Sequence, residues 1–449
     1  ADAVRYGKIL LGGMALAALA PDARAAGFAL KEQSATAQGN AFAGATAGAE
    51  DPSYMFFNPA ALGFQSGWQA QAVVSRVMPR SELKDATGTT LPPISAPIGG
   101  PDSDGDIGDD GTVPAVYLTG ELPHDWHVGL SVTAPFGLST SYPDAWVGRY
   151  HGTDSALKTY NIGPTVAWRP VPWLSLGGGV QIQYADAELQ NRIDFGTIGA
   201  AATIPGAIPT AQDGRVRVVG DDWATGFTLG AIAEPLAGTR VGVAYRSEVD
   251  HTLSGDGDFV LDRAGIGAAL SGLTGRFVDT GVTAGLTTPE SVSFGVRQQL
   301  GKRWAVMADW QWTGWSSIEE LRLDFDNPAE PDNVTEQRWN DVWFAALGAT
   351  WWPSDAWTLR AGVAYDQSPV TDKHRTPRIP DGDRYWLSLG VGWKPTNWLS
   401  VDAAYTHIFV EDTEVDLTTA GVGNQFRGNL AADYENGIDI VAISGRVRF

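Results

Sequence analysis

From about residue 65 to the last residue, apolar and polar side chains alternate along the sequence, and this alternation decides the fold class. In residues 385–393 every second side chain is apolar, and residues 441–449 at the end of the chain repeat the pattern. A two-residue period indicates β-strands with one face in an apolar medium and the other face in a polar one. The sequence therefore predicts an all-β protein built from many such strands.

Trp and Tyr residues mark both ends of the apolar faces. Trp357 and Tyr365 bracket one face, and Tyr385 and Trp393 bracket another. Eight residues at about 3.3 Å each, in a tilted strand, cover the roughly 25 Å apolar band between the aromatic girdles of an outer-membrane barrel. A soluble β-sandwich also alternates, but its apolar faces would not end so regularly in Trp and Tyr.

Residues 1–25 have the three parts of a secretory signal peptide. Arg5 and Lys8 form a basic region, a short apolar stretch follows, and Ala23-Arg24-Ala25 is a small-x-small cleavage site. The apolar stretch is too short for a transmembrane helix, which needs roughly 20 residues. No other segment approaches a spanning helix, so a location in a membrane would require strands.

The connections between the predicted strands have two distinct lengths. Six are short turns with recurrent Pro, Gly and Trp, such as 122–126, and seven are long and polar or rich in Gly, such as 192–221. Short turns at one end and long loops at the other are typical of outer-membrane barrels. We therefore expect a 14-stranded antiparallel transmembrane β-barrel over residues 65–449, with its first strand near 65–80 and its sixth near 222–234.

One segment, residues 26–64, fits neither the signal peptide nor the strands. From Gly27 to Phe64 it contains ten Ala, five Gly and six aromatic residues, but only four charged ones. It lacks the alternation of a strand, and its glycines and prolines interrupt any helix. Because so apolar a segment is unfavourable in water, we expect the barrel to enclose it as an N-terminal hatch, or plug, inside the lumen.

Composition argues against several functions. The net charge of −21 disfavours nucleic acid, whose phosphates need Lys and Arg, and the absence of Cys means that no disulfide framework supports the fold. Because no nucleophile–base arrangement, metal cluster or cofactor motif stands out, we expect neither an enzyme nor a metal or cofactor site.

Residues 102–110 have carboxylates spaced as in a calcium loop, but they lack its Gly and final Glu. They predict a solvated loop, with loose divalent bridging to lipopolysaccharide as the alternative.

Several short motifs together resemble one family in their order and spacing. They are Ala26–Leu30 (AGFAL), Asn58-Pro59-Ala60, Ala134–Leu138 (APFGL), Tyr245–Glu248 (YRSE), Asp366–Val370 (DQSPV), Arg375, Ile379–Arg384 (IPDGDR) and Trp386–Ser388 (WLS). Through them the whole mature chain resembles the FadL/TodX family of outer-membrane transporters for long-chain fatty acids and other hydrophobic compounds.

The resemblance implies a mechanism in which the hatch fills the lumen from the periplasmic side. An apolar substrate would be caught in a groove between extracellular loops, pass to a lumen pocket beside the hatch, and leave sideways into the outer leaflet. Asn58-Pro59-Ala60 would form a gate contact between hatch and wall, with a plain turn as the alternative. Pro135-Phe136-Gly137 would kink the third strand and open the lateral exit, with an ordinary bulge as the alternative.

The resemblance also implies a lumen pocket. Phe28, Phe42, Phe56 and Phe57 either line it or anchor the hatch to the wall, and the sequence favours neither. A carboxylate headgroup needs a cation, and Arg322 falls where fatty-acid members carry a basic residue. The fatty-acid members have a second basic position, which aligns here with the uncharged Asn191 or, one residue later, with Arg192. Because of this departure the sequence does not decide between fatty acids and other hydrophobic substrates. We expect wall ion pairs from four further residues: Arg246, Glu248, Asp383 and Arg384.

The long connection after residue 260 has apolar residues at helical spacing. They are Leu261, Ile266, Leu270, Leu273 and Phe277. We expect a short helix that flanks the outer groove, with local packing of a long loop as the alternative.

The sequence thus predicts passive transport of long-chain fatty acids or similar hydrophobic compounds across a Gram-negative outer membrane. The alternatives are uptake of monoaromatic or alkane hydrocarbons by the same mechanism, a general diffusion porin, and a barrel that acts only as an adhesin or scaffold. We expect a monomer in contact with outer-membrane lipid and lipopolysaccharide. The terminal Phe449 resembles the signal that barrel-assembly machinery reads.

Overall fold

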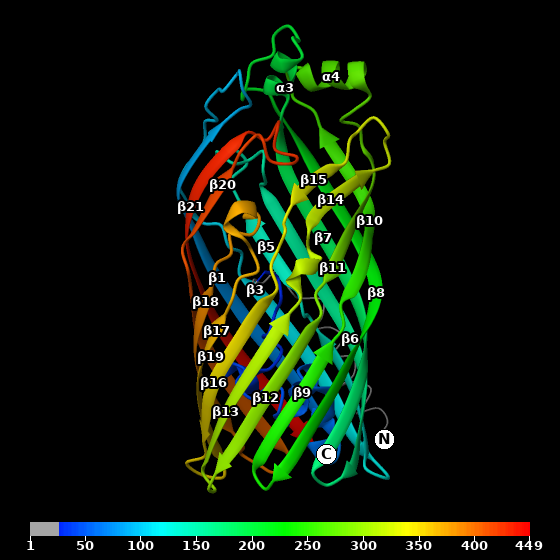
Figure 1. Cartoon of the computed structure of the whole chain (residues 1–449), viewed down its shortest axis with the longest axis vertical. Helices are drawn as coiled ribbons and strands as arrows, with labels where there is room; N and C mark the ends of the chain where they lie inside the picture. The colour runs from blue at the N-terminus through cyan, green and yellow to red at the C-terminus, as the bar shows by residue number, and fades with distance from the viewer. Residues whose placement is uncertain (1–26) are drawn as a thin grey trace.

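In the computed structural model, which describes residues 27–449, antiparallel strands pair edge to edge until the last one meets the first (Figure 1). The first strand pairs with the last from Gln69↔Arg448 to Thr89↔Asn429. Closure matters because lipid offers no hydrogen-bond partners to a free strand edge. The expected fourteen-stranded barrel is confirmed. The expected signal peptide, residues 1–25, lies outside the described residues.

Fourteen strands form the wall, and six of them are each interrupted into two segments. In chain order the segments are β1 (Gln69–Thr89), β3 (Gly111–Leu122), β4 (Trp126–Thr133) with β5 (Gly137–Ser141), β6 (Asp154–Val171), β7 (Leu174–Asp194), β8 (Asp213–Leu236), β9 (Thr239–Arg246) with β10 (Val249–Val260), β11 (Thr280–Thr288) with β12 (Ser291–Leu300), β13 (Trp304–Thr313) with β14 (Glu320–Phe325), β15 (Asn333–Glu336) with β16 (Val342–Trp351), β17 (Trp357–Asp366), β18 (Arg384–Trp393), β19 (Leu399–Val410) with β20 (Thr413–Leu417), and β21 (Asn429–Arg448). The short β2 (Asp104–Asp106) pairs with the edge of β1.

Short helices occur inside the barrel and in its long loops. The hatch segment, residues 27–64, lies within the lower half of the barrel, and α3 and α4 lie at the opposite end from the short turns (Figure 1). The helices are α2 (Ala35–Gln38), η2 (Pro52–Phe56) and η3 (Pro59–Phe64) in the hatch segment, and α3 (Phe195–Ala201), α4 (Ile266–Thr274), η4 (Trp315–Ser317) and η5 (Asp372–His374) in the loops. Within residues 27–449 no helix has both the length and the apolar character needed to cross a membrane.

The apolar faces of the strands point out of the barrel, as the alternation predicts. On β18, Tyr385 and Leu387 are each 49% exposed, whereas the intervening Trp386 is 2% exposed and faces the lumen. Apolar side chains on the outer surface of a closed barrel are stable only against lipid. This face is therefore the membrane face.

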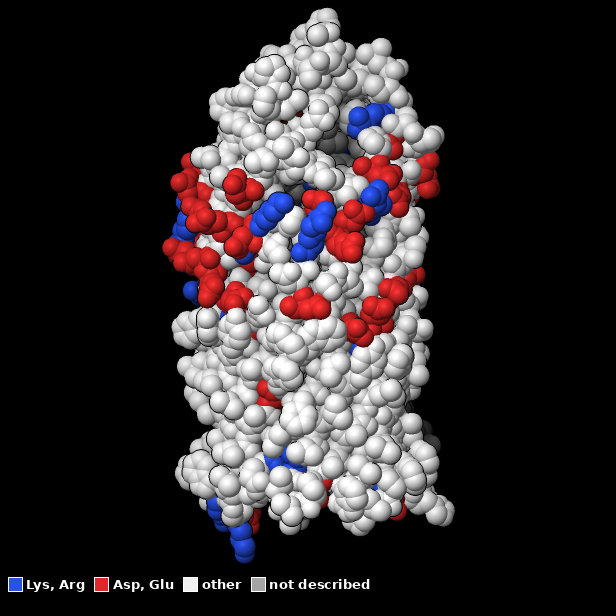
Figure 2. Space-filling view, viewed as in Figure 1, with Lys and Arg blue, Asp and Glu red and all other residues white. Residues whose placement is uncertain are grey.

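Aromatic pairs mark both edges of the membrane face. Trp357 and Trp393 stack near the short turns, with ring centroids 6.1 Å apart, and Tyr365 and Tyr385 lie eight residues further along with centroids 5.3 Å apart. Figure 2 shows few charged residues on the lower half of the molecule, whereas Asp and Glu gather on its upper half. The membrane belt thus occupies the half of the barrel that carries the short turns.

Beyond the belt the alternation is inverted, with apolar side chains inside and charged ones outside. On β8, Val216 and Val218 are buried toward the lumen, and the intervening Arg217 pairs with Glu188 on the outer face. Water replaces lipid outside this part of the wall, so the outer face no longer needs to be apolar.

This inversion corrects two strand boundaries predicted from the sequence. The first strand ends at Thr89 rather than near 80, and the sixth begins at Asp213 rather than near 222. The charged outer residues of these extensions resemble a loop in sequence, although their backbones continue the barrel ladder.

Placing a charge on the membrane belt should weaken folding into a bilayer. Leu347 lies midway along β16, between Trp343 and Trp351, and is 64% exposed. We expect Leu347→Arg to lower the free energy of unfolding by about 2–4 kcal/mol in urea titrations in vesicles, because Arg is unfavourable near the bilayer midplane. The control is Leu273→Arg, which changes a 74% exposed leucine on α4 and should have little effect. Equal losses in both variants would contradict this placement of the membrane.

Candidate functional site

The hatch segment is fastened to the barrel wall by hydrogen bonds. The Asn58 side chain donates from Nδ2 to the carbonyl oxygens of Thr46 at 2.7 Å and Val243 at 3.2 Å, and its Oδ1 accepts from the Ala60 amide at 3.0 Å. The Ser175 hydroxyl of β7 donates to the Ala60 carbonyl at 2.7 Å. Asn58-Pro59-Ala60 therefore lies against the wall, as a gate contact requires.

Two glycines in the wall make this close contact possible. A Cβ atom at Gly230 would lie 2.0 Å from Asn58 Oδ1, and one at Gly177 would lie 2.4 Å from the Ala60 nitrogen. Both distances are far below van der Waals contact. Any side chain at either position would push the hatch segment away from the wall.

The third strand of the barrel is interrupted at residues 134–136, between β4 and β5. Pairing with β6 stops at Thr133↔Asn161 and resumes at Gly137↔Lys158. Pro135 lacks an N–H group, which explains why the ladder cannot continue through it. The interruption lies where the sequence predicts the kink.

Backbone groups on both sides of the kink bond to the hatch segment, while the Phe136 carbonyl still accepts from the Thr159 amide of β6 at 3.1 Å. The Leu30 amide donates to the Pro135 carbonyl and the Gly137 amide donates to the Phe28 carbonyl, both at 2.8 Å. These two bonds make residues 28–30 a short extra strand against the kink, with Ala29 opposite Phe136.

A hatch glutamine completes this contact, which we call the hatch–kink contact. Gln33 donates from Nε2 to the Ala134 carbonyl at 2.7 Å, and its Oε1 accepts from the Ala134 amide at 3.2 Å. The Phe136 amide donates to the Thr159 hydroxyl of β6 at 2.9 Å. Sequence reasoning missed this contact because it joins residues about a hundred positions apart, and no local pattern marks the pairing.

Next to Gln33 is a buried carboxylate without a partner. Glu32 has no exposed surface, and within residues 27–449 neither of its carboxylate oxygens accepts a hydrogen bond. Its backbone carbonyl accepts from the Ser75 hydroxyl at 2.9 Å. A buried carboxylate without hydrogen bonds is costly to the state that contains it.

An upper pocket of about 440 Å³ lies in the barrel above the hatch segment. Most of its wall is apolar and comes from the strand extensions beyond the membrane belt, which the inverted alternation makes apolar inside. Its apolar lining includes Phe28, Leu138, Leu157, Leu189, Leu253, Leu286, Ile318, Trp339 and Ile379.

Charged residues also line the upper pocket, namely Arg322, Arg378, Glu319, Glu320 and Asp324. Of the two arginines, only Arg322 is ion-paired among the described residues. Arg322 bonds Glu320 and Asp332, each at 2.8 Å, whereas Arg378 donates to the Ser155 hydroxyl at 2.7 Å and to backbone carbonyls. Burial lowers the pKa of Arg378 to about 9, which leaves it charged at neutral pH. Arg378 is thus the cation of this pocket that has no carboxylate partner among the described residues, although four of its five N–H donors bond to neutral groups, and sequence reasoning missed it.

The second basic residue considered from the sequence lies elsewhere. Arg192 pairs with Asp144 of the neighbouring long loop rather than entering the upper pocket. The preceding Asn191 does approach the pocket cation, because its Oδ1 accepts from Arg378 at 3.4 Å. The upper pocket therefore contains Arg378, from the loop before β18, instead of the expected Arg192 from a strand.

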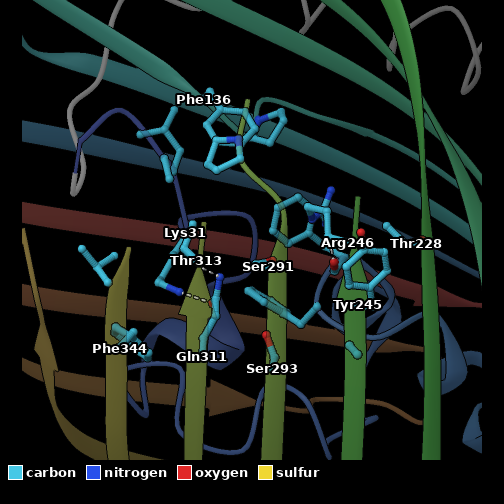
Figure 3. Close-up of a pocket in the computed structure, with 18 of the residues that line it drawn as sticks. Lys31, Phe136, Thr228, Tyr245, Arg246, Ser291, Ser293, Gln311, Thr313 and Phe344 are labelled. Atoms are coloured by element: carbon cyan, nitrogen blue, oxygen red, sulfur yellow. Dashed lines mark hydrogen bonds between the residues drawn. The ribbon is translucent and has the colours of Figure 1, made fainter. Parts of the chain in front are cut away.

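A lower pocket of about 100 Å³ lies between the hatch segment and the kink (Figure 3). Phe56, Phe57 and Pro59 of the hatch segment line it, as do Pro135 and Phe136 of the kink. Its polar lining includes Lys31, Thr228, Arg246, Ser291, Ser293, Gln311, Thr313 and Asp366.

The four phenylalanines predicted for the lumen divide between pocket and anchor. Phe28 lines the upper pocket, and Phe56 and Phe57 line the lower one. Phe42 is 2% exposed and packs against Phe57 and Trp386, with centroids 5.7 and 5.9 Å apart. Phe42 therefore fits the anchoring alternative.

Four aromatic rings pack between the two pockets. Phe28 of the hatch segment contacts Phe136 of the kink, Trp315 of η4 and Trp339, at centroid distances of 5.8, 4.7 and 5.6 Å. Phe28 and Trp339 line the upper pocket, and Phe136 and Trp315 line the lower one. We call these rings the aromatic partition. One ring of the aromatic partition, Phe28, belongs to residues 28–30 of the hatch segment, which pair with the kink.

The expected wall ion pairs are partly wrong. Arg384 does pair, but with Asp381 rather than Asp383, which accepts instead from the Ser368 amide at 2.8 Å. Arg246 donates to the Phe56 carbonyl at 2.7 Å and to the Gln181 side chain, because it points down the lumen toward the hatch segment.

The residues considered for the outer groove form a helix that packs locally. The expected helix is present as α4, and Ile266, Leu270 and Phe277 are buried around Phe195 of α3. Leu261 is partly buried against the same cluster, whereas Leu273 is exposed. A role of α4 in a groove stays a prediction.

The acidic loop uses several carboxylates to hold its own shape. Asp106 Oδ1 accepts from the Ser81 amide at 2.9 Å, Asp109 accepts from the Ser139 hydroxyl at 2.7 Å, and Asp110 pairs with Arg76 at 2.8 Å. These contacts fit the predicted solvated loop, and divalent bridging to lipopolysaccharide stays the alternative.

Removing the glutamine amide should loosen the kink. We expect Gln33→Leu to cost about 1–3 kcal/mol, because the amide and carbonyl of Ala134 lose their partners in a buried site. Hydrogen–deuterium exchange should show faster exchange over residues 134–137. The control is Gln38→Leu, which alters another buried hatch glutamine that faces Ile440 instead of the kink. Equally fast exchange at the kink in both variants would contradict the role of Gln33.

Comparisons with known proteins agree with this architecture. Residues 16–449 match the family model described as outer membrane protein transport protein (OMPP1/FadL/TodX). The chain is 30% identical to a putative outer membrane protein of Neisseria meningitidis serogroup B, with 98% of each chain covered. It is 27% identical to a long-chain fatty acid transport protein of Escherichia coli, over 88% of this chain and 90% of that protein.

A solved structure gives the same result. The crystal structure of a Pseudomonas aeruginosa FadL homologue superposes with a TM-score of 0.84 at 27% identity, over 94% of this chain and 99% of that one. Members of this family are outer-membrane transport channels for hydrophobic compounds and are not enzymes. The chain described here belongs to the OMPP1/FadL/TodX family of outer-membrane transport proteins.

Proposed function

We propose that this protein passively transports long-chain fatty acids, or amphiphiles of the same chemistry, into the outer leaflet of the outer membrane. The observation that carries the proposal is the upper pocket, a mostly apolar cavity in which Arg378 has no carboxylate partner among the described residues, whereas Arg322 is paired with Glu320 and Asp332. Burying an acyl chain gains roughly 0.8 kcal/mol for each methylene group. A charged guanidinium supplies the strong hydrogen bonds that a carboxylate needs away from water.

The route leads from the upper pocket through the aromatic partition to the lower pocket. A chain that moves downward must displace Phe28. Since the Phe28 carbonyl accepts from Gly137, displacement of residue 28 also removes a hydrogen bond from the kink. Arrival of cargo and loosening of the kink are therefore one event, and the interrupted strand is the point of lateral exit.

Binding measurements with two matched probes test the substrate class. We expect purified protein to bind hexadecanoate more tightly than hexadecanol, and Arg378→Gln to weaken hexadecanoate binding about tenfold or more while changing hexadecanol binding little. The control is Arg217→Gln, which removes an ion-paired arginine of the barrel wall. Toluene binding tighter than that of hexadecanoate would favour the hydrocarbon alternative and overturn the fatty-acid proposal.

A reversible cross-link tests the exit route. Ala29 and Phe136 are directly opposite, and their flanking hydrogen bonds define a non-hydrogen-bonded pair, with Cα atoms about 4.5 Å apart. This spacing suits a disulfide. Because the sequence has no Cys, Ala29→Cys with Phe136→Cys introduces a single possible bridge.

We expect oxidation of the double variant to stop hexadecanoate uptake by cells or vesicles, and reduction to restore it. Binding in the upper pocket should persist in both redox states. The two single variants control for loss of either side chain. Full uptake by the oxidised protein would rule out exit through movement of the hatch–kink contact.

A further inference from the structure

The lower pocket contains two cations whose hydrogen bonds, among the described residues, all go to neutral groups. Lys31 comes from the hatch segment and Arg246 from the end of β9, and both point into the cavity between hatch and kink (Figure 3). Among the residues that the structure describes, neither is ion-paired.

Their existing partners are neutral. The Lys31 ammonium donates to the Gln311 side chain and lies 4.1 Å from the centroid of the Phe344 ring. The Arg246 guanidinium lies 4.5 Å from the centroid of the Phe56 ring and donates to Gln181 and to the Phe56 carbonyl. An ammonium has three N–H donors and a guanidinium has five, so each retains donors for a ligand.

Two other arginines near the hatch are neutralised by carboxylates, whereas Arg169 and Arg446 donate to hatch carbonyls without an ion pair among the described residues. Arg297 pairs with Glu50 at 2.9 Å, and Arg360 pairs with Asp402 at 2.9 Å. Partly buried cations in a protein are normally paired in this way. A cation that faces a cavity without such a partner is available to an anion that enters from outside.

One carboxylate also lines the lower pocket. Asp366 is 4% exposed and contributes one negative charge near Lys31. Among the lining residues, two cations and one carboxylate leave a net positive charge of one, and the carboxylates of Asp309 and Glu32 act on Lys31 from outside the lining. Hydroxyl groups of Ser291, Ser293 and others add neutral donors around it.

We infer that the lower pocket is a second headgroup site, which binds the carboxylate of an anionic amphiphile as it leaves the upper pocket. This inference rests on the proposed function. A cavity of about 100 Å³ holds a carboxylate and a few carbon atoms but not a whole acyl chain. The tail therefore extends past the aromatic partition or out through the kink. When the ligand carboxylate leaves Arg378, Lys31 and Arg246 bind it. The carboxylate therefore has a cationic partner on each side of the aromatic partition.

The placement of Lys31 couples this second site to the hatch. Lys31 is one residue from Leu30, whose amide holds the Pro135 carbonyl of the kink. A carboxylate that draws the Lys31 ammonium away from Gln311 acts directly on the chain segment that closes the exit.

Crystals soaked with two bromine-labelled probes test the inference. In 2-bromohexadecanoate the bromine lies beside the carboxylate, and 2-bromohexadecan-1-ol is its uncharged analogue. In the wild-type protein we expect anomalous bromine peaks in both pockets with the acid, but only in the upper pocket with the alcohol. In Lys31→Gln/Arg246→Gln we expect the lower peak to vanish and the upper peak to remain. The control variant, Arg217→Gln, should keep both peaks.

Titration in solution provides a second readout. Native mass spectrometry should show up to two hexadecanoates per wild-type protein and one per double variant, with the weaker of the two affinities reduced at least about tenfold. The crystal structure of the variant itself shows whether it has folded.

The remaining outcomes of the crystal soaks each contradict either the second headgroup site or the proposed function. An acid peak in the lower pocket of the double variant, an equal alcohol peak there, or no lower acid peak in saturated wild-type crystals would each overturn the second headgroup site. Absence of either probe from the upper pocket would instead overturn the proposed function. The two failures are therefore distinguishable.

Discussion

The structure depends on one requirement, which is that every backbone N–H and C=O group at membrane depth must find a partner inside the protein. Closure of β1 onto β21 meets that requirement around almost the whole wall. Residues 134–136 interrupt the ladder of the third strand, because Pro135 has no N–H group to donate, although the Phe136 carbonyl still accepts from the Thr159 amide of β6. The hatch segment supplies the missing partners through its backbone at residues 28–30 and through the amide of Gln33. The hatch is thus part of the hydrogen-bonding of the wall, and the wall is complete only while the hatch is docked.

A second organising feature is the change of polarity along the barrel. Within the membrane belt the outer face is apolar, and the lumen is filled by the hatch segment and its polar contacts. Beyond the belt the outer face is charged, and the lumen wall becomes apolar through residues such as Val216, Leu253 and Val282. The same strands therefore provide a surface for lipid at one level and an apolar container at the next. This arrangement places an apolar cavity in the part of the protein that is surrounded by water.

The sequence predicts those features that depend on local periodicity and composition. Alternation and aromatic spacing predict the barrel and the membrane face, the short turns and long loops predict fourteen strands, and the apolar segment predicts a hatch. The contact of Asn58-Pro59-Ala60 with the wall is implied by the family resemblance. The extents of β1 and β8 could not be predicted, because the inverted alternation beyond the belt has the composition of a loop. Arg378 and the Gln33 contact could not be predicted either. Both depend on which distant segments meet in the lumen, and that is set by the closure and tilt of the sheet.

Glu32 indicates how firmly the hatch is held. A carboxylate buried without a hydrogen bond raises the free energy of the docked state relative to any state in which water reaches it. The buried Glu32 carboxylate therefore offsets part of the stability that the wall contacts give to the docked hatch segment. Regions of a protein open as separate cooperative units according to such local differences in stability. In the proposed mechanism this cost favours undocking of the hatch as one unit within a folded barrel, and it comes from a residue that lines neither pocket.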